Sequence, residues 1–258
     1  MAIDLNALRK KHEQLESKGQ GGEDFLEKFM QLKDGKNLLR ILPGKEEDDL
    51  FYAETKIHRV PTADGKVKNF HCRKVHGEDC PLCDAYFGLW KIYNEGGKVD
   101  EEFADAARQI KPRERYYLNV VDRESGSVKI LSVGQIIFSK IISTILDEDY
   151  GDITDLKEGN DFTVEKHMEG KWPKYDKSAA RPKKTAAGKK MEVDAWMDSL
   201  HDIQGLVKKE EYEDVRNAAE ILLPSLKERP VVSNSAATED AGEEKEVSDE
   251  DFVNKLKS

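Results

Sequence analysis

The sequence predicts a mixed fold in which many short β-strands and a few helices form a small, elaborated barrel between solvated ends. Hydrophobic residues make up only 38% of the 258 residues and the mean hydropathy is −0.73, so we expect one core of roughly 150–200 residues flanked by polar termini. Short apolar runs bounded by turn residues recur along most of the chain. Three cysteines, at positions 72, 80 and 83, indicate a metal site within this core.

Several classes of protein are excluded by composition. No run approaches the ~20 apolar residues of a membrane-spanning helix, and collagen, coiled-coil rods and mucin-like stalks differ in composition. The first residues, MAIDLNALRKKHEQ, lack the apolar stretch of a signal peptide, so we expect a cytoplasmic protein. We expect no disulfide framework, because an odd, clustered set of cysteines is typical of a metal site in a reducing compartment.

Residues 1–22 predict an N-terminal arm. Apolar residues at helical spacing between positions 5 and 15 are followed by the glycine-rich stretch 18–22, which ends the helix. Because so short a helix is not stable alone in water, we expect it to dock on another surface. The basic cluster of this arm consists of Arg9, Lys10 and Lys11.

The predicted core, residues 23–228, follows the arm. Short apolar runs predict strands at residues 37–42, 50–60, 67–71, 116–121, 128–131, 161–167 and 189–193. Apolar residues at helical spacing predict helices at residues 81–94, 101–110, 133–146 and 209–223. Between the last two strands, residues 170–188 would form a long loop, and loops of that length are usually functional or disordered.

The net charge of −10 hides a strong segregation of charge. Residues 239–251 hold eight acidic side chains and one basic one, within a stretch (229–258) that we expect to be a disordered acidic tail. Residues 171–190 hold eight basic side chains and one acidic one. An acidic average therefore does not exclude a polyanionic ligand, because binding responds to the local field.

Aromatic residues are interleaved with the bases of the predicted long loop. Trp172 and Tyr175 lie among Lys171, Lys174 and Lys177. A solvated linker has little use for tryptophan, whereas a groove for single-stranded nucleic acid needs cations for phosphates and aromatic faces for bases. The pattern therefore favours a nucleic-acid contact over a plain linker.

The cysteines have the spacing of a metal chelate. Cys80 and Cys83 form a tight two-thiolate pair with a proline after the first cysteine, and Cys72 supplies a third thiolate. Zinc takes four ligands in a tetrahedron, and three thiolates with one imidazole form a closed structural set that leaves no position for water. We therefore expect a structural zinc ion rather than a catalytic one.

The fourth ligand is a choice among three histidines. His76 follows Cys72 by four residues and is a natural candidate by local spacing. His58 lies across a predicted hairpin, whose turn at Asp64-Gly65 brings it back toward the cysteines. His71 neighbours Cys72 and would point to the opposite face of a strand. Spacing alone leaves His58 and His76 both open.

In this stretch the chain resembles the single-stranded DNA-binding (helix-destabilising) proteins of T-even-like bacteriophages. The matching pattern consists of His58, Cys72, His76-Gly77, Cys80-Pro81-Leu82-Cys83 and Tyr86. In that family the upstream histidine is the zinc ligand. The resemblance therefore implies one zinc ion bound by His58, Cys72, Cys80 and Cys83.

The resemblance extends over about residues 30–225. The run Tyr116–Val121 resembles the family's basic-aromatic strand, and residues 170–176 resemble a loop with two DNA-facing aromatic residues. It implies an OB-fold core with a zinc subdomain at about residues 55–95, a basic arm through which copies associate along the strand, and an acidic tail that contacts replication and recombination proteins. It also implies a location in the cytoplasm of an infected bacterial host.

The expected function is sequence-independent binding of single-stranded DNA, which coats and protects the strand in replication, recombination and repair. Bases would stack on aromatic side chains while basic side chains contact phosphates. The aromatic candidates are Tyr86, Trp90, Tyr93, Tyr116, Tyr117, Trp172 and Tyr175. The basic candidates are Lys111, Arg113, Arg115, Lys140, Lys171, Lys174 and Lys177. Tyr86, Trp90 and Tyr93 also fit the ordinary core of a helix, and this alternative stays open.

The alternative function is a zinc-containing, nuclease-like DNA-processing enzyme. The sequence has no phosphate-binding Gly-x4-Gly-Lys-Ser/Thr loop and no His-Glu-x2-His motif. Nor does it have the His-x-Glu and Pro-Cys-x2-Cys order of a zinc deaminase. We therefore expect no enzymatic activity and name no catalytic residue.

Overall fold

The computed structural model describes residues 25–222 except 47, 63–64 and 100. The predicted arm (1–22) and tail (229–258) therefore lie outside the described residues, and their proposed boundaries stay predictions. The chain divides into two units, Met1–Leu223 and Pro224–Ser258, and everything described below belongs to the first. Among the described residues, no helix combines the length and apolar character needed to cross a membrane.

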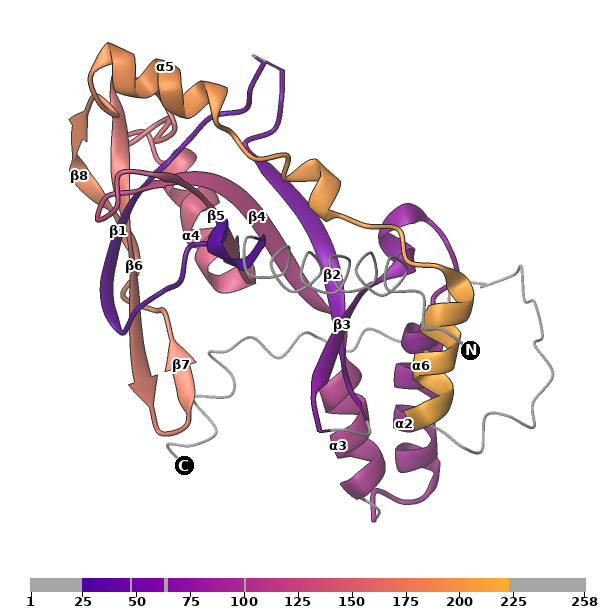
Figure 1. The fold of residues 1–258 in the computed structure, drawn as a ribbon. Helices are drawn as coiled ribbons and strands as arrows, with labels where there is room; N and C mark the ends of the chain where they lie inside the picture. Colours follow the sequence, from indigo (N-terminus) through magenta and orange to yellow (C-terminus); the bar gives the residue numbers. More distant parts are fainter. Residues whose placement is uncertain (1–24, 47, 63–64, 100, 223–258) are drawn as a thin grey trace, which may run out of the picture. The chain divides into compact units, whose positions relative to one another are not determined.

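Eight strands form one antiparallel sheet, which confirms the predicted mixed fold of strands and helices (Figure 1). The strands are β1 Gly35–Ile41, β2 Tyr52–Pro61, β3 Val67–His71, β4 Arg113–Asp122, β5 Val128–Val133, β6 Gly159–Glu169, β7 Trp172–Lys174 and β8 Ala179–Thr185. Their order is β3-β2-β4-β1-β6-β7, with β5 paired to β4 and β8 paired to β6. Because these pairings form an open, branched path among the described strands, the OB-fold classification stays a prediction.

The helices pack at two places on this sheet. They are α2 Pro81–Glu95, α3 Glu101–Ile110, α4 Gln135–Ile145, α5 Lys190–Asp198 and α6 Tyr212–Leu222, with short 3-10 turns η1 Arg73–His76 and η2 Gln204–Leu206. Helix α2 contacts α3 and α6, and α3 contacts β2, so these three helices gather at the β2–β3 end (Figure 1). Helix α4 packs against β4, β5 and β8.

The two faces of the sheet differ because alternate residues of a strand point to opposite sides. On β4, Tyr116, Leu118 and Val120 belong to the main hydrophobic core, together with Phe138 and Ile141 of α4. We call this the core face. The residues that alternate with these along β4, which include Arg113, Arg115 and Tyr117, lie on the opposite face. We call it the cleft face.

The predicted strand at 189–193 is wrong. Helix α5 occupies this stretch, because the Glu192 carboxylate accepts a hydrogen bond from the Lys189 N–H (2.8 Å) at its first turn. Four residues later, the indole N–H of Trp196 donates to the Gly126 carbonyl (3.0 Å) and fixes the helix on the β4–β5 turn. The helix thus follows from a cap and one aromatic anchor.

The predicted long loop at 170–188 is also wrong. It contains β7 and β8, both antiparallel partners of β6. Strand β8 is an edge strand that pairs only with β6 among the described strands, and it carries the exposed residues Arg181, Pro182, Lys183 and Lys184. Apolar alternation is weak in such a strand, because backbone pairing rather than side-chain burial holds it in place. The other predicted elements are found, with 67–71 and 101–110 at the predicted bounds.

A buried ion cluster joins four strands at the β6–β8 end. The fully buried guanidinium of Arg40 donates to Asp161 (2.9 Å) and to the Thr185 carbonyl (2.9 Å). Arg123, just after β4, donates to the same Asp161 oxygen (2.6 Å). Burial alone would raise the pKa of Asp161, but the hydrogen bonds from Arg123 and Arg40 outweigh it and lower that pKa. The cluster therefore ties β1, β4, β6 and β8 together.

Candidate metal centre and nucleic-acid interface

Four potential metal ligands converge from three elements. His58 lies on β2, Cys72 directly follows β3, Cys80 precedes the first residue of α2, and Cys83 lies in the first turn of α2. The β2–β3 hairpin brings Cys72 back to β2, where its N–H donates to the Lys56 carbonyl (2.7 Å). Pro81 suits the start of α2, because the first helical residue needs no N–H donor.

The geometry of these four side chains fits a tetrahedral ion. Their ligand atoms all lie within 4.8 Å of one another, and all four residues are buried. The His58 Nε2 lies 3.6 Å from Cys80 Sγ and 3.5 Å from Cys83 Sγ, and the Cys72 and Cys83 sulfurs are 3.5 Å apart. Ligands about 2.0–2.3 Å from a tetrahedral zinc ion would be separated by about 3.5–3.8 Å. The cluster could therefore hold one metal ion with little rearrangement.

The imidazole of His58 is oriented by the backbone. Its Nδ1 lies 2.7 Å from the Ile110 carbonyl oxygen at the end of α3. A carbonyl only accepts hydrogen bonds, so Nδ1 carries a proton, and Nε2 is the ring nitrogen that faces the sulfurs and would bind an ion. Metal-binding histidines commonly donate their second ring nitrogen in this way.

The thiols are too close to ionise independently. Hydrogen bonds with Cys72 and Cys83 lower the pKa of Cys80, whereas hydrogen bonds with Cys72 and Cys80, together with burial, raise the pKa of Cys83. Burial alone lowers the pKa of His58, but hydrogen bonds with Cys72, Cys80 and Ile110 raise it to about 9. A divalent cation at the centre would let all three sulfurs be thiolates, because its charge offsets their repulsion.

The other two histidines of the sequence motif lie elsewhere. His76 is exposed, and its Nε2 lies 3.4 Å from the Lys208 carbonyl oxygen. His71 Nδ1 lies 3.0 Å from the Thr55 hydroxyl oxygen. Among the described residues, the structure thus groups the three cysteines with His58. Gly77, which has a positive φ of 73°, turns the chain between His76 and Cys80.

A cleft lies on the cleft face, and it is lined by Ile57 and Arg59, the two neighbours of His58 on β2. Its floor is formed by Ile57, Arg59, Asn69, His71, Arg113, Arg115, Tyr117 and Ser132 from β2 to β5. One wall consists of Phe25, Leu26, Phe29, Met30 and Gln31. The other wall consists of Leu206, Lys208 and Glu210, from the segment that joins α5 to α6, residues 199–211, which we call the strap.

The cleft combines cationic and aromatic side chains. Arg59 of β2 joins Arg113 and Arg115 of β4 on its floor. Phe25 is 43% exposed and packs edge-on against Phe29, which in turn packs edge-on against Tyr117 with ring centroids 6.4 Å apart. Guanidinium groups for phosphates and an exposed ring for a base are the two components of a single-strand site.

The predicted residues of the β6–β7 hairpin lie at the far end of the sheet from the cleft. Strand register places Trp172 opposite Glu169 and Lys174 opposite His167, on the same side of the sheet as Tyr117. Trp172 is 73% exposed. Strands β1 and β6 separate β7 from β4, so the two groups of predicted DNA contacts are not one pocket.

Three further predicted residues have structural partners. Tyr116 is on the core face, where its ring stacks on Phe138 at 3.8 Å with an interplanar angle of 8°. Tyr175 is half-buried against the same core, and the Lys140 ammonium donates to the Asp176 carbonyl (2.9 Å). These contacts hold the loop after β7 against α4, and a DNA-binding role for these residues stays a prediction.

The aromatic residues of α2 pack between helices. Trp90 is edge-on to both Tyr86 and Tyr93, and the Arg108 guanidinium of α3 lies 5.7 Å from its ring centroid. The Tyr93 hydroxyl donates to Glu101 (2.6 Å). This packing favours the helix-core alternative, while the stacking role stays a prediction. Exposed side chains among the remaining candidates are those of Lys111, Lys171 and Lys177.

Sequence reasoning missed several residues of the cleft. Arg59 is two residues from Ile57 on a strand that was predicted, so the pleat places both side chains on one face, and this could have been read from the sequence. Phe25 and Phe29 have helical spacing just before the first strand, so the sequence did contain a signal for this aromatic pair. Lys208 lies in the strap, which has no periodic pattern and gave no signal.

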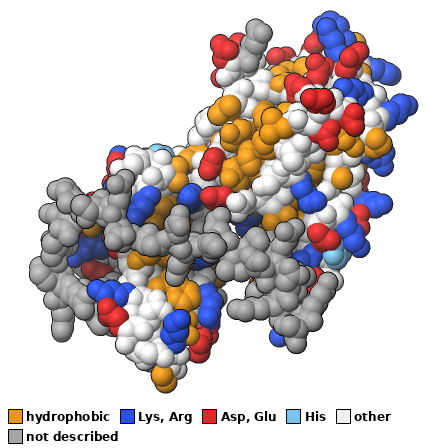
Figure 2. Space-filling view, turned by 180° about the vertical axis from the view of Figure 1, so that it is seen from behind, with side chains coloured by type: hydrophobic (Ala, Val, Ile, Leu, Met, Phe, Trp, Pro, Cys, Tyr) orange, Lys and Arg blue, Asp and Glu red, His pale blue; other side chains and the backbone are white. Residues whose placement is uncertain are grey.

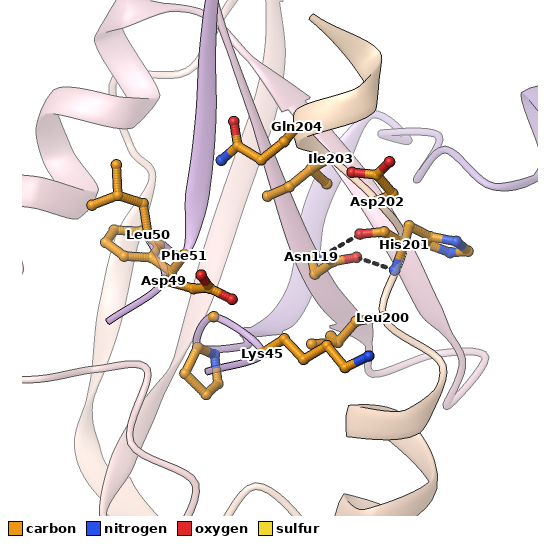
Figure 3. Close-up of a pocket in the computed structure, with 12 residues that line it drawn as sticks. Lys45, Asp49, Leu50, Phe51, Asn119, Leu200, His201, Asp202, Ile203 and Gln204 are labelled. Atoms are coloured by element: carbon orange, nitrogen blue, oxygen red, sulfur yellow. Dashed lines mark hydrogen bonds between the residues drawn. The ribbon is translucent and has the colours of Figure 1, made fainter. Parts of the chain in front are cut away.

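A second pocket lies where the strap crosses β4. Asn119 exchanges two hydrogen bonds of 3.0 Å with the backbone of His201, as Figure 3 shows. The pocket is lined by Pro43, Gly44, Lys45, Asp49, Leu50, Phe51, Asn119, Leu200, His201, Asp202, Ile203 and Gln204. Its lining mixes both signs of charge with apolar groups, so its clearest role is to fix the strap.

Comparison with protein-family models gives one informative result. A model described as gp32 DNA binding protein like matches residues 33–223. The match covers the whole sheet, the four ligand residues, the cleft floor and the strap. A comparison with curated proteins gives no match.

Proposed function

Because this chain belongs to the family of gp32-like DNA-binding proteins, we propose that it binds single-stranded DNA, largely without sequence preference, along the cleft. The observation that carries the proposal is the group of three arginines, Arg59, Arg113 and Arg115, on the floor of a cleft with an aromatic wall. A duplex is rigid and its bases are stacked, whereas a single strand can turn its bases onto protein rings.

The proposed chemistry divides the strand into two parts. Phosphates lie near the guanidinium groups of the floor, which releases counterions and makes affinity depend on salt. Bases stack on exposed rings, for which we propose Phe25 at the cleft and Trp172 on the β6–β7 hairpin. Since every base has an aromatic face, stacking tolerates any sequence.

We further propose that the four buried ligands hold one zinc ion. Three thiolates and one imidazole are a soft donor set that suits zinc, and a full set of four protein ligands makes the ion structural. When bound, the ion supplies folding free energy to the β2–β3 hairpin and the start of α2. We assign it no catalytic step.

In its biological role, the protein would coat and protect single strands during replication, recombination and repair. The basic arm (residues 1–22) would contact neighbouring copies, and the acidic tail (229–258) would contact replication and recombination proteins. Both proposals rest on sequence, since these segments lie outside the described residues. No observation on this chain favours the nuclease alternative.

The test compares two double variants that remove the same charge. Arg113→Ala/Arg115→Ala alters the cleft floor, and Lys183→Ala/Lys184→Ala alters the exposed edge strand β8. We expect the first pair to weaken binding of a labelled oligonucleotide much more than the second, with duplex binding weak throughout. Equal losses in both would mean that binding follows total charge and that the cleft is not the site.

The same samples test the alternative function. Incubating labelled single strands with the zinc-loaded protein should give stoichiometric, salt-sensitive binding and intact strands. Cleavage that scales with zinc content would favour the enzyme instead. Metal analysis of the purified protein should give one zinc ion per chain.

A further inference from the structure

The first part of the strap is fixed to β2, β4 and β5 of the core. There, Asn119 holds the backbone of His201, and Gln204 donates to the Tyr52 carbonyl (3.1 Å). Ile203 is buried against Tyr117 and Ile130. Farther along the strap, Leu206 and Val207 pack against the same cluster, and the Glu210 carboxylate accepts a hydrogen bond from the His71 N–H (3.2 Å). Leu206, Lys208 and Glu210 form the wall of the cleft.

The most extensive contacts of this wall come from the loop between two of the proposed metal ligands, Cys72 and Cys80. Arg73 directly follows Cys72, and its guanidinium donates to the Glu210 carbonyl of the strap and pairs with Glu78. Glu78 also pairs with Lys209 of the strap. The Arg73 side chain is only 11% exposed, and its Nε donates to the Asp79 carbonyl (3.0 Å), next to Cys80.

Arg73 thus makes contacts on two sides. Within residues 72–80 it ties the ends of the loop together, and beyond them it holds the strap. Its guanidinium also lies 5.4 Å from the ring centroid of Tyr212, where α6 begins. It does not line the cleft, so it has no direct route to a bound strand.

We propose that Arg73 is a positioning residue that couples the metal centre to the strap wall of the cleft. With the ion bound, Cys72 and Cys80 fix the loop, and the loop holds Arg73 and Glu78 against the strap. Without the ion the loop loses its anchors, the strap wall loosens, and Lys208 no longer faces the arginines of the floor. The proposal rests on the proposed function only for its effect on DNA.

The central experiment uses Arg73→Ala, with Arg216→Ala as its control. Arg216 carries the same charge, and its partners Glu213 and Glu220 lie on its own helix. In zinc-loaded protein without DNA, hydrogen exchange of amides 204–210 should speed up about tenfold in Arg73→Ala and stay unchanged in Arg216→Ala. Unchanged exchange in Arg73→Ala with zinc bound would overturn the proposal.

Binding of a short oligonucleotide supplies the second readout. Arg73→Ala should lower affinity about five- to tenfold, the size expected for loss of a hydrogen-bonded attachment. The salt dependence should keep the wild-type slope, because no phosphate contact is removed. A slope smaller by ~0.7 would make Arg73 a direct phosphate contact and refute a positioning role.

A double cycle then tests the coupling itself. Removing zinc and removing Arg73 should be non-additive, so that zinc-free wild type and zinc-free Arg73→Ala bind alike. Additive losses would show that metal and arginine act separately. If Arg73→Ala fails to retain zinc, Glu78→Gln takes its place, because it breaks the pairs with Arg73 and Lys209 with little change of shape. Exchange of amides 204–210 should then speed up in zinc-loaded Glu78→Gln as well. Because exchange is measured without DNA, it can fail or succeed independently of single-strand binding.

Discussion

The two ends of the sheet carry positive charge in different ways. At the cleft end, which comprises β2–β4, α2, α3, α6 and the metal ligands, a few arginines lie on a concave floor between two walls. At the hairpin end, which comprises β6–β8 and α5, more basic side chains lie exposed along an edge, where Figure 2 shows them from behind. By the number of its charges, the hairpin end would be the stronger candidate for the DNA-binding site, whereas the arrangement of the charges favours the cleft.

The ends also differ in what holds them together. The cleft end contains the cluster of four potential metal ligands, which we propose to hold a cation, and the hairpin end contains the buried Arg40–Asp161–Arg123 cluster. Loss of one should therefore leave the other largely intact. The following predictions test this independence, beginning with the largest expected effect.

Cys83→Ser should abolish tight metal binding and loosen the cleft end. Because structural zinc binding is folding free energy, residues 55–95 should become open to limited proteolysis while β6–β8 stays protected. Metal analysis and mapping of the cut sites check both parts. His76→Ala is the control, and loss of zinc in that variant together with its retention in His58→Ala would contradict the ligand set.

Asp161→Asn should destabilise the hairpin end. It leaves the fully buried Arg40 without its carboxylate, which costs about 3–5 kcal/mol, measurable by denaturant unfolding. Asp34→Asn removes the exposed partner of Lys166 and should cost little. A loss of zinc in Asp161→Asn would show that the two ends are not independent.

The same carboxylate gives a pH dependence with a definite sign. The pKa of Asp161 is lower in the folded chain than in the unfolded one. Its contribution to the free energy of unfolding is therefore fully present above the unfolded value of about 3.9 and is lost as the pH falls through the lowered folded value. Asp161→Asn should remove the part of the acid sensitivity that comes from this carboxylate. If the variant loses stability at low pH as the wild type does, Asp161 does not make this contribution.

Trp172→Ala and Tyr117→Ala should separate contact from packing. Trp172 is 73% exposed, so its loss should weaken single-strand binding by about 1–3 kcal/mol without changing stability. Tyr117 is 7% exposed and packs against Phe29, so its loss should lower both the affinity for single strands and the stability of the fold. Titrations with oligonucleotides of different base composition, with thermal unfolding alongside, distinguish the two. If Trp172→Ala binds as the wild type does, the hairpin end carries no part of the strand.

Removing residues 235–258 should have the smallest effect and the opposite sign. A tethered polyanion has a high effective concentration at nearby cations, so the truncated chain should bind single strands more tightly, most of all at low salt. Titrations at two salt concentrations check this. Identical binding by truncated and full-length chains at low salt would leave partner contacts as the tail's role.

Much of the fold could be predicted because local patterns determine it. Strand alternation located the β2–β3 hairpin, and helical spacing gave α3 at its observed bounds. The spacing of Cys72, Cys80 and Cys83 located the metal site, yet the fourth ligand needed the hairpin register or a family resemblance. A ligand from another strand cannot be chosen by local spacing.

The cleft could not be predicted as a whole, because its parts come from distant segments. Arg113 and Tyr117 were named from one strand, but Phe25 and Lys208 reach it from segments more than 85 residues away on either side. The hairpin end was misread for a different reason. Strand β8 has few buried side chains, so backbone pairing with β6, which no residue pattern reports, decides its structure.

The sequence of the edge strand β8 affects how copies of this chain would behave when they lie close together. A protein that coats a strand brings many copies into close contact, and any open sheet edge could then pair with the edge of a neighbour. Pro182 removes one backbone N–H from β8, and Lys183 and Lys184 place like charges on approaching copies. If copies line up along a strand as we propose, these residues would keep their sheets from pairing, so that the assembly could still be dismantled.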